Sequence, residues 1–481
     1  MAYGETGHYV SLSVPDSVKD TKQLDAVAKR IDVALATGQY DSLRQMIWNK
    51  DVETMPRPGL RELQLERLRW SVQWAYDRVP FHKRRLDGVG VVPGRIRSLD
   101  DLRRLPFMVK SDLREHYPDG LFAVPRSEIV RIHASSGTKG KATIVGYTRE
   151  DIETWAHVCA RSLACGGAHP DSVIHVAYGY GLFTGGLGLH YGAERLGALT
   201  VPASGGNTPR QITLMQDLGA TVLCCTPSYA LNVAETMRDR GIERSTLALE
   251  VGVFGAEPWT VGMREEIERA LGLVALDIYG LSEVMGPGVS MESVEDRDGL
   301  FIWEDHFYPE VIDPSSGEVL PYGEEGELVF TTLTKRAFPV LRYRTGDLCT
   351  LFAEPTRSGR TMVRMTKVKG RTDDMLIVRG VNIFPSEIER VVLEQRELAP
   401  HYQILLSRDG ALDRLAVHVE VVVEVWESLG STIDSDEARR LAGRLRSELA
   451  NTLSLSADVQ LGGPGTIPRS EGKAVRVVDR R

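Results

Sequence analysis

The stretch LEVGVFGAEPWTVGMREEIERALGLVALDIYG, Leu249 to Gly280, contains two short apolar runs separated by a longer amphipathic segment. LEVGVFG and VALDIYG have the length of strands, whereas Thr260 to Leu271 is amphipathic and long enough for a helix. Alternation of strand and helix is typical of a parallel sheet covered by helices. The stretch therefore predicts a strand-helix-strand unit of an α/β fold.

The same alternation extends over Ile129 to Ile278, where the apolar runs SVIHVAYGY and ATVLCC alternate with amphipathic stretches such as Tyr229 to Gly241. We expect an α/β domain in which mostly parallel sheets carry helices on both faces. After Glu324, the short runs GEEGELVFTTL and PVLRYRTGDLCTLF carry turn signals and predict an additional β subdomain.

The two ends of the chain have sequence patterns that differ from that of the middle. The first part shows helical periodicity interrupted by Pro80, so residues 1–128 are expected to be a mainly helical lead-in. Beyond Gly370 the order is strand, helix, two strands, helix and strand, which resembles a small ferredoxin-like α+β unit. We therefore expect an N-terminal domain, residues 1–370, and a C-terminal domain, residues 371–481.

The composition is that of a globular protein with an acidic balance. The 481 residues are 42% hydrophobic and 26% charged, with a formal net charge of -8, which argues against nucleic acid as the main partner. The five cysteines have no paired spacing, as in a reducing compartment. Neither a secretory signal pattern nor a membrane-length apolar run is present, so we expect a cytoplasmic protein without a membrane partner.

The stretch RIHASSGTKGKATIVGYT, Arg131 to Thr148, concentrates hydroxyls, glycines and lysines between two strand-like segments. Such a loop suits a phosphate group, because small residues let backbone N–H groups approach an anion. By composition alone, a Ser-, Gly- and Lys-rich run of this kind is more often a flexible exposed loop. A Walker loop is excluded because Ala142 follows Lys141, and a dinucleotide fingerprint fails because Thr184 stands where the third glycine is required.

Six motifs occur in order along the chain: SSGTKGK, FGAEPW, DIYGLSE, YRTGDL, GRTDDM and PRSEGKAVRVVD. With these motifs, and a change of domain at GRTDDM, nearly the whole chain resembles the adenylate-forming (ANL) superfamily, most closely its phenylacetate-CoA ligase branch. The resemblance implies ATP-dependent, AMP-forming activation of an aryl carboxylic acid to an acyl adenylate. Transfer to the thiol of CoA would follow, and homodimers are common in this branch.

The resemblance also assigns nucleotide-binding residues. It implies that the SSGTKGK loop holds the β- and γ-phosphates, that Glu283 carries Mg²⁺, and that Asp347 and Arg371 bind the ribose. Tyr279 would offer a ring face to adenine, although a core aromatic is an equal interpretation of this residue alone. The full set is Ser135, Ser136, Gly137, Thr138, Gly140, Lys141, Gly255, Ala256, Glu257, Asp277, Tyr279, Ser282, Asp347 and Arg371.

Lys473 in the C-terminal motif has the role that most separates this family from a generic ATP-binding protein. A lysine in such a segment is ordinarily a solvated charge, but the resemblance implies that Lys473 bridges the attacking carboxylate and the α-phosphate. Rotation of the C-terminal domain about Asp373 would then withdraw it and open the site to a thiol. Lys473 and Glu283 are therefore the expected catalytic residues.

The segment AYGYGLFTGGLGLHYG, Ala177 to Gly192, resembles the aryl-acid segment of the family. Two departures from the family pattern are Lys139, where Thr is common, and Leu189, where a small residue is expected. A bulkier Leu189 would shorten the pocket and favour a hydroxy- or amino-substituted benzoate over phenylacetate. The expected acid-binding residues are Tyr178, Phe183, Gly185, Leu189 and Ile278.

Two other functions stay open from the sequence. An aryl-acid AMP ligase would load the acyl group onto the phosphopantetheine thiol of a separate carrier protein, and no residue pattern distinguishes it from a CoA ligase. A non-catalytic nucleotide-binding paralogue is disfavoured because Glu283 and Lys473 are both present. The expected ligands are thus ATP, Mg²⁺, a small aryl acid, and CoA or a carrier protein.

Overall fold

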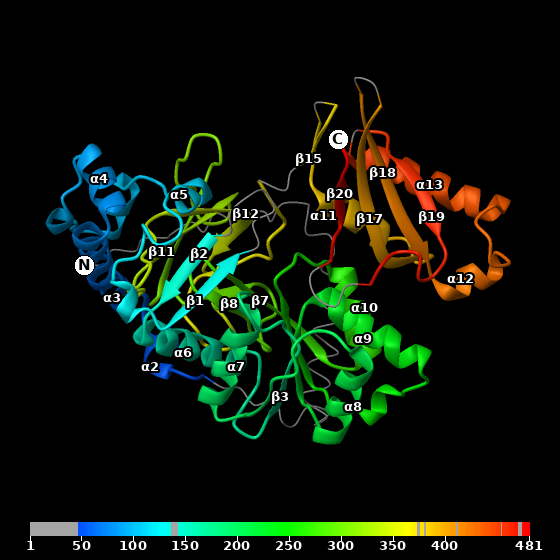
Figure 1. Ribbon diagram of the computed structural model, residues 1–481, viewed down its shortest axis with the longest axis horizontal. Coiled ribbons are helices and arrows are strands. Elements are labelled where there is room, and N and C mark those ends of the chain that lie inside the picture. Colours follow the sequence, from blue (N-terminus) through cyan, green and yellow to red (C-terminus); the bar gives the residue numbers. More distant parts are fainter. Residues whose placement is uncertain are drawn as a thin grey trace, which may run out of the picture. The chain divides into compact units, whose positions relative to one another are not determined.

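The structure is a computed structural model that describes residues 47–135, 143–372, 376–379, 381–409, 412–453, 455–469 and 474–481 (Figure 1). Strands and helices alternate through the middle of the chain, and a smaller sheet with its own helices follows near the C-terminus. The α/β fold with a small α+β part, expected from the sequence, is confirmed.

The described chain begins with helices that pack around a core containing Leu68, Val72 and Leu86. Helix α3 (Arg57–Arg78) ends before Pro80, and α4 (Pro80–Gly88) begins at it, because proline lacks an N–H and disfavours helical backbone in the residue before it. The other helical elements here are α2 (Lys50–Glu53), η1 (Pro93–Arg95), η2 (Leu99–Arg104), α5 (Lys110–Glu115) and η3 (Arg126–Glu128).

The next element is a hairpin of two antiparallel strands, β1 (Arg131–Ser135) and β2 (Thr143–Tyr147), drawn in cyan in Figure 1. Ser135 lies opposite Thr143 in the register of this hairpin. The segment expected to bind phosphate therefore connects two paired strands, as the sequence predicts, and residues 136–142 of it lie outside the described part.

Five parallel strands form one half of a 12-stranded sheet, in the order β4-β3-β5-β6-β7. Leu223 and Cys225 of β5 share a core cluster with helices α8, α9 and α10, whereas Cys224 lies on the opposite face, where it interacts with Cys159 of α6. Helices thus cover both faces, as predicted. The bounds are β3 (Val173–Val176), β4 (Leu199–Val201), β5 (Val222–Cys225), β6 (Val251–Gly255), β7 (Val274–Leu281), α6 (Arg149–Cys165), α7 (Gly185–Leu196), α8 (Thr208–Leu218), α9 (Pro227–Asp239), η4 (Arg244–Thr246) and α10 (Val261–Leu271).

The other half of the large sheet is antiparallel and contains the strands predicted after Glu324. The pairing of β7 with β8 joins it to the parallel half, so these strands continue the same sheet. Its elements are β8 (Gly286–Glu292), β9 (Leu300–Ile302), β10 (Phe307–Ile312), β11 (Glu325–Thr332), β12 (Tyr343–Phe352), β13 (Arg364–Met365) and β14 (Gly370–Arg371).

The C-terminal part has a core cluster of its own and a four-stranded sheet in the order β19-β18-β17-β20. Helix α13 contributes a stripe of buried residues four positions apart, from Leu441 to Leu453, as the 3.6-residue period requires. Arg379 has a φ of 50° and lies in a hairpin turn, so the segment expected to be one strand forms β15 and β16. The elements are β15 (Leu376–Val378), β16 (Val381–Ile383), α11 (Pro385–Leu393), β17 (Leu398–Asp409), β18 (Leu412–Val421), α12 (Val423–Ser428), α13 (Asp436–Leu453), β19 (Asp458–Gly462) and β20 (Val477–Asp479).

Candidate nucleotide and acid site

Asp347, Tyr279 and Arg371 come together although they are distant in sequence. Asp347 of β12 pairs with Arg371 of β14, which places both side chains at one point of the sheet. The Tyr279 hydroxyl donates to Asp347 Oδ2 at 2.6 Å, and Arg371 Nη1 donates to Asp347 Oδ1 at 2.7 Å. An ionised carboxylate is acceptor-only, a chemistry that suits the hydroxyl groups of a ligand.

The protonation of this group is fixed by its surroundings. Burial raises the pKa of Tyr279 well above its usual value, and the neighbouring carboxylate of Asp347 raises it further. Tyr279 therefore remains a hydrogen-bond donor at neutral pH. A second bond from Arg371 Nη2 to the carbonyl of Thr345, 3.1 Å long, fixes the guanidinium in the plane of the pair.

The GAE motif begins with Gly255, the last residue of β6, and continues into a turn with Ala256 and Glu257. A side chain on Gly255 would approach the carbonyl oxygen of Ile278 to 2.1 Å, and Ala256 has a φ of 70°, so the turn is tight. The Glu257 carboxylate accepts from the backbone N–H of Ser228 at 2.7 Å and from that of Ala474 at 3.0 Å. The GAE motif thus touches the residue that directly follows Lys473.

Asp277 of β7 belongs to a buried cluster of charged side chains. Its backbone N–H donates to Glu292 Oε2 at 3.0 Å, and Glu292 in turn pairs with Arg264 at 2.6 Å. Burial raises the pKa of Asp277, and the charge of Lys367 opposes the rise. Within the described part of the chain, Asp277 is therefore held among protein charges.

Glu283 follows β7 and is 6% exposed. None of the described residues donates a hydrogen bond to its carboxylate, and the neighbouring Ser282 hydroxyl lies 3.3 Å from that of Thr184. A nearly buried carboxylate with open acceptor sites suits a hard cation such as Mg²⁺. Among the described residues no group of three or more His, Cys, Asp or Glu side chains is arranged to hold a metal ion. Bound Mg²⁺ ordinarily completes its coordination with water and substrate phosphates.

Lys335, which sequence reasoning missed, is fully buried beside this carboxylate. Its Nζ donates to the Val284 carbonyl at 2.9 Å and lies 4.6 Å from the centre of the Tyr147 ring. Burial lowers the pKa of Lys335 to about 8, although the charges of Asp151 and Glu283 oppose the shift. A lysine in TLTKRAFP carries no motif, and only the fold brings it to the Glu283 turn.

The acid-binding segment combines buried and exposed side chains. Tyr178 is 4% exposed, and its hydroxyl is buried without a partner among the described residues, whereas Phe183 is 44% exposed. A side chain on Gly185 would meet the Phe183 ring at 2.4 Å, so the ring would have to shift to admit one. Ile278 is nearly buried in β7, and Leu189 of α7 has no exposed surface, so Leu189 does not border an open space in this structure.

Strand β1 contacts this segment through two hydrogen bonds to the Leu182 carbonyl. The Ala134 N–H donates to it at 3.0 Å, and His133 Nδ1 lies 3.1 Å from it. Ser135 ends the same strand, and its hydroxyl is buried without a partner among the described residues. The segment that precedes the expected phosphate loop is therefore bonded to the expected acid segment, which no motif indicates.

Several expected site residues lie outside the described residues. They are Ser136, Gly137, Thr138, Gly140 and Lys141 of the SSGTKGK loop, Asp373 of the hinge, and Lys473. Their roles stay predictions.

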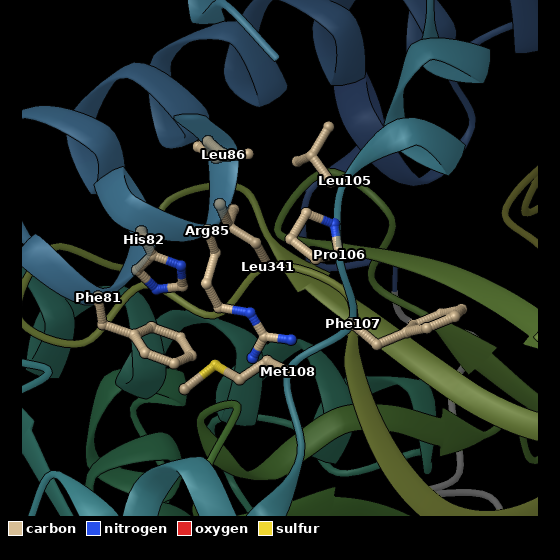
Figure 2. Close-up of a pocket in the computed structure, with 9 residues that line it drawn as sticks. All are labelled: Phe81, His82, Arg85, Leu86, Leu105, Pro106, Phe107, Met108 and Leu341. Atoms are coloured by element: carbon tan, nitrogen blue, oxygen red, sulfur yellow. The ribbon is translucent and has the colours of Figure 1, made fainter. Parts of the chain in front are cut away.

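A small hollow, shown in Figure 2, is lined by none of the described residues that were expected to form the site. Phe81, His82 and Arg85 of α4 and Phe107 and Met108 line one part of it. None of the described nucleotide or acid residues borders it, so it is not a candidate for ATP. The described part of the chain also holds no helix long and apolar enough to cross a membrane.

Comparisons with known proteins identify the family of the chain. Residues 99–333 match the model of the AMP-binding enzyme family, and residues 380–481 match that of the AMP-binding enzyme C-terminal domain. The chain is 53% identical over 444 residues to Phenylacetate-coenzyme A ligase of Thermus thermophilus, a match that covers 91% of this chain and 100% of that protein.

Two crystal structures of 2-hydroxyisobutyryl-CoA ligase are also similar, and each match covers 90% of this chain and 92% of that protein. The postadenylation state, with an R3-HIB-AMP ligand, gives a TM-score of 0.84 at 30% identity. The thioesterification state, with 2-HIB-AMP and CoA, gives a TM-score of 0.66 at 31% identity.

The two family matches, the large sheet and the small C-terminal sheet place the chain in the class of adenylate-forming enzymes. The chain belongs to the AMP-binding enzyme family, in the branch of the phenylacetate-CoA ligases. The expectation of an AMP-forming acid-thiol ligase is confirmed at the level of this class.

Proposed function

We propose that this enzyme joins phenylacetate to CoA in a reaction that converts ATP to AMP and pyrophosphate. The observation that carries the proposal is the preformed group of Asp347, Tyr279 and Arg371, which orients a carboxylate toward which ribose hydroxyls can donate. It occurs in a chain 53% identical to a phenylacetate-CoA ligase over that protein's full length, which supports phenylacetate as the acid.

In the first half-reaction, a carboxylate oxygen of the acid attacks the α-phosphorus of ATP, and the bond to the bridging oxygen of pyrophosphate breaks. The two reacting groups are both anions, so catalysis consists mainly of positioning and of charge stabilisation. In the proposal Asp347 fixes the ribose, the SSGTKGK loop holds the β- and γ-phosphates, and the Lys473 ammonium lies between the carboxylate and the α-phosphate.

Glu283 fits the role of Mg²⁺ ligand in this proposal. Glu283 is 6% exposed, and its carboxylate accepts no hydrogen bond from the described residues, which suits it to a bound cation. Bound Mg²⁺ would neutralise charge on the phosphate oxygens. Lys335 keeps the turn in place through its bond to the Val284 carbonyl and adds positive charge behind the carboxylate.

In the second half-reaction, the thiol sulfur of CoA attacks the acyl carbonyl, and AMP and a proton leave. The proposal places a rotation about Asp373 between the two steps, so that one pocket serves both. The greater likeness to the postadenylation form than to the thioesterification form, a TM-score of 0.84 against 0.66, supports assigning the described arrangement to the first step.

For the acid, the proposal uses Tyr178 and Ile278 as buried walls and Phe183 as an exposed ring at the entrance. Aromatic and aliphatic surfaces of this kind suit a flat phenyl group. A substituted benzoate was the sequence-based alternative, on the ground that Leu189 shortens the pocket. Because Leu189 has no exposed surface, any such effect would have to act through packing.

A panel of acids tests the proposal. Phenylacetate, benzoate, and hydroxy- and aminobenzoates are incubated with ATP and Mg²⁺, with and without CoA, and pyrophosphate release is measured. We expect the highest kcat/KM with phenylacetate and formation of phenylacetyl-CoA when CoA is present. Higher kcat/KM with a benzoate would contradict the proposed acid, and adenylate formation without transfer to CoA would favour a carrier protein as acceptor.

A further inference from the structure

Arg469 and Ala474, the residues on either side of the segment 470–473, both contact carboxylates outside the C-terminal part. Arg469 Nε donates to Glu235 Oε2 at 2.7 Å, and the Ala474 N–H donates to Glu257 Oε2 at 3.0 Å. Lys473 belongs to this segment. Residues 470–473 lie outside the described part, and the two described residues next to them are both held by contacts with carboxylates.

The two contacts share one rigid support, helix α9. Glu235 lies on α9, and Glu257 accepts from the N–H of Ser228 near the start of the same helix at 2.7 Å. A helix keeps its residues at fixed separations. Arg469 and Ala474 are therefore both positioned relative to helix α9 of the nucleotide domain.

Arg469 is shared between two carboxylates. Its Nη1 and Nη2 each donate to Glu420 of β18 at 2.8 Å, while its Nε faces Glu235. Glu420 also accepts from the backbone N–H of Gly465 at 3.1 Å. The contacts between Glu420 and Arg469 therefore lie within the C-terminal part and do not depend on Glu235. Glu235 is the partner that links this arrangement to the nucleotide domain.

Glu235 has a second donor from the C-terminal part, His401 Nε2 of β17. The Glu235 side chain is 19% exposed and that of Arg469 is 25% exposed, so water screens the contact only in part. Burial raises the pKa of Glu235, but the hydrogen bonds and charges of His401 and Arg469 outweigh it and hold the pKa below its usual value. The carboxylate is therefore ionised at neutral pH.

We propose that Glu235 is a positioning residue that stabilises, through its contacts with Arg469 and His401, the arrangement in which Arg469 and Ala474 contact the nucleotide domain. The inference rests on the proposed function, since it assigns this arrangement to adenylate formation. Glu235 touches no substrate in this scheme. Glu235 instead raises the fraction of enzyme molecules in the arrangement that carries out the first half-reaction. Its contacts with Arg469 and His401 must break before the second half-reaction.

The variant Glu235→Gln tests this, because the amide keeps the size and loses the charge, while Glu420 still satisfies Arg469. We expect ATP-pyrophosphate exchange with phenylacetate to fall about fivefold in kcat with little change in either KM, as for loss of a partly screened ion pair. Thioester formation from synthetic acyl adenylate and CoA should stay unchanged or become faster. The control Glu266→Gln removes an exposed ion pair with Arg269 on α10 and should alter neither rate.

A second variant keeps the test decisive if the first lowers stability. His401→Gln removes the other donor to Glu235. Because both single variants disrupt the same contact, the double variant should lose less exchange activity than the two single losses combined, and a double-mutant cycle measures this difference. Equal losses in both half-reactions, or unchanged exchange in Glu235→Gln, would overturn the proposal. Absence of phenylacetate-dependent exchange in the unmodified enzyme would instead overturn the proposed function.

Discussion

The nucleotide side and the acid side of the site are prepared to different degrees. On the nucleotide side, Asp347 receives hydrogen bonds of 2.6 and 2.7 Å from Tyr279 and Arg371, so the carboxylate is oriented before a ligand arrives. On the acid side, the Tyr178 hydroxyl is buried without a partner among the described residues, and Phe183 is 44% exposed. The polar groups of the nucleotide side are thus already hydrogen-bonded to one another. The residues expected to contact the acid include an exposed ring and a hydroxyl without a partner among the described residues.

The largest effect on turnover is expected from Lys473→Ala, which removes the charge that the proposed mechanism places between the attacking carboxylate and the α-phosphate. We expect adenylate formation to slow roughly 100-fold or more, as loss of an oriented charge-stabilising donor does in other enzymes. Consumption of synthetic acyl adenylate with CoA should continue at nearly the unmodified rate. Equal losses in the two steps would mean that Lys473 supports the fold and does not act in adenylation alone.

Asp347→Asn breaks the nucleotide side directly. The amide offers Tyr279 and Arg371 one oxygen in place of two and places an NH₂ group against a donor, so both partners lose their fixed geometry. We expect kcat/KM for ATP to fall about 30-fold, the loss of one or two charge-assisted hydrogen bonds. The KM for phenylacetate should remain within about twofold of the unmodified value, because the acid side is separate. A larger rise in the KM for the acid than in that for ATP would contradict the division of the site.

Leu189→Ala examines the acid side and the sequence-based idea of a shortened pocket. Because Leu189 is fully buried, truncation should lower the free energy of unfolding by about 2–5 kcal/mol, measured by urea denaturation. The ratio of kcat/KM for phenylacetate to that for benzoate separates the two explanations. A shift toward phenylacetate supports an indirect effect on pocket length, and an unchanged ratio means that Leu189 serves packing only.

His82→Gln should not affect turnover, because His82 borders the hollow in Figure 2 and not the site. Burial lowers the pKa of His82 to about 4, although its bond to the Pro339 carbonyl at 3.1 Å opposes the shift. Between pH 6.5 and pH 4 the His82 imidazole is therefore protonated in the unfolded chain but neutral in the folded protein. The neutral histidine thus contributes about 3 kcal/mol to the free energy of unfolding above pH 6.5, and this contribution is lost by pH 4.

Glutamine can still donate to the Pro339 carbonyl but does not titrate, so His82→Gln should unfold with a weaker dependence on pH in this window. Thermal or urea unfolding of both proteins from pH 7 to pH 4 measures the difference. The same pH dependence in the two proteins would show that His82 is not the buried neutral group described here.

Residues carried by a local motif could be predicted from the sequence, and residues placed by tertiary contacts could not. Asp347 and Arg371 lie in YRTGDL and GRTDDM, and the alternation of strands and helices was sufficient to predict the parallel sheet that supports them. Lys335 and Glu235 carry no pattern of their own. Their surroundings arise from contacts with residues far away in sequence, such as Val284 and Arg469, which no local period encodes.

The central claim, that the enzyme activates an acid through its adenylate, is tested most directly by identifying the nucleotide product. Purified enzyme is incubated with ATP, Mg²⁺, phenylacetate and CoA, and the products are separated and analysed by mass spectrometry. The account predicts AMP, pyrophosphate and phenylacetyl-CoA in equal amounts, because attack occurs at the α-phosphorus. ADP and inorganic phosphate in place of AMP and pyrophosphate would contradict it.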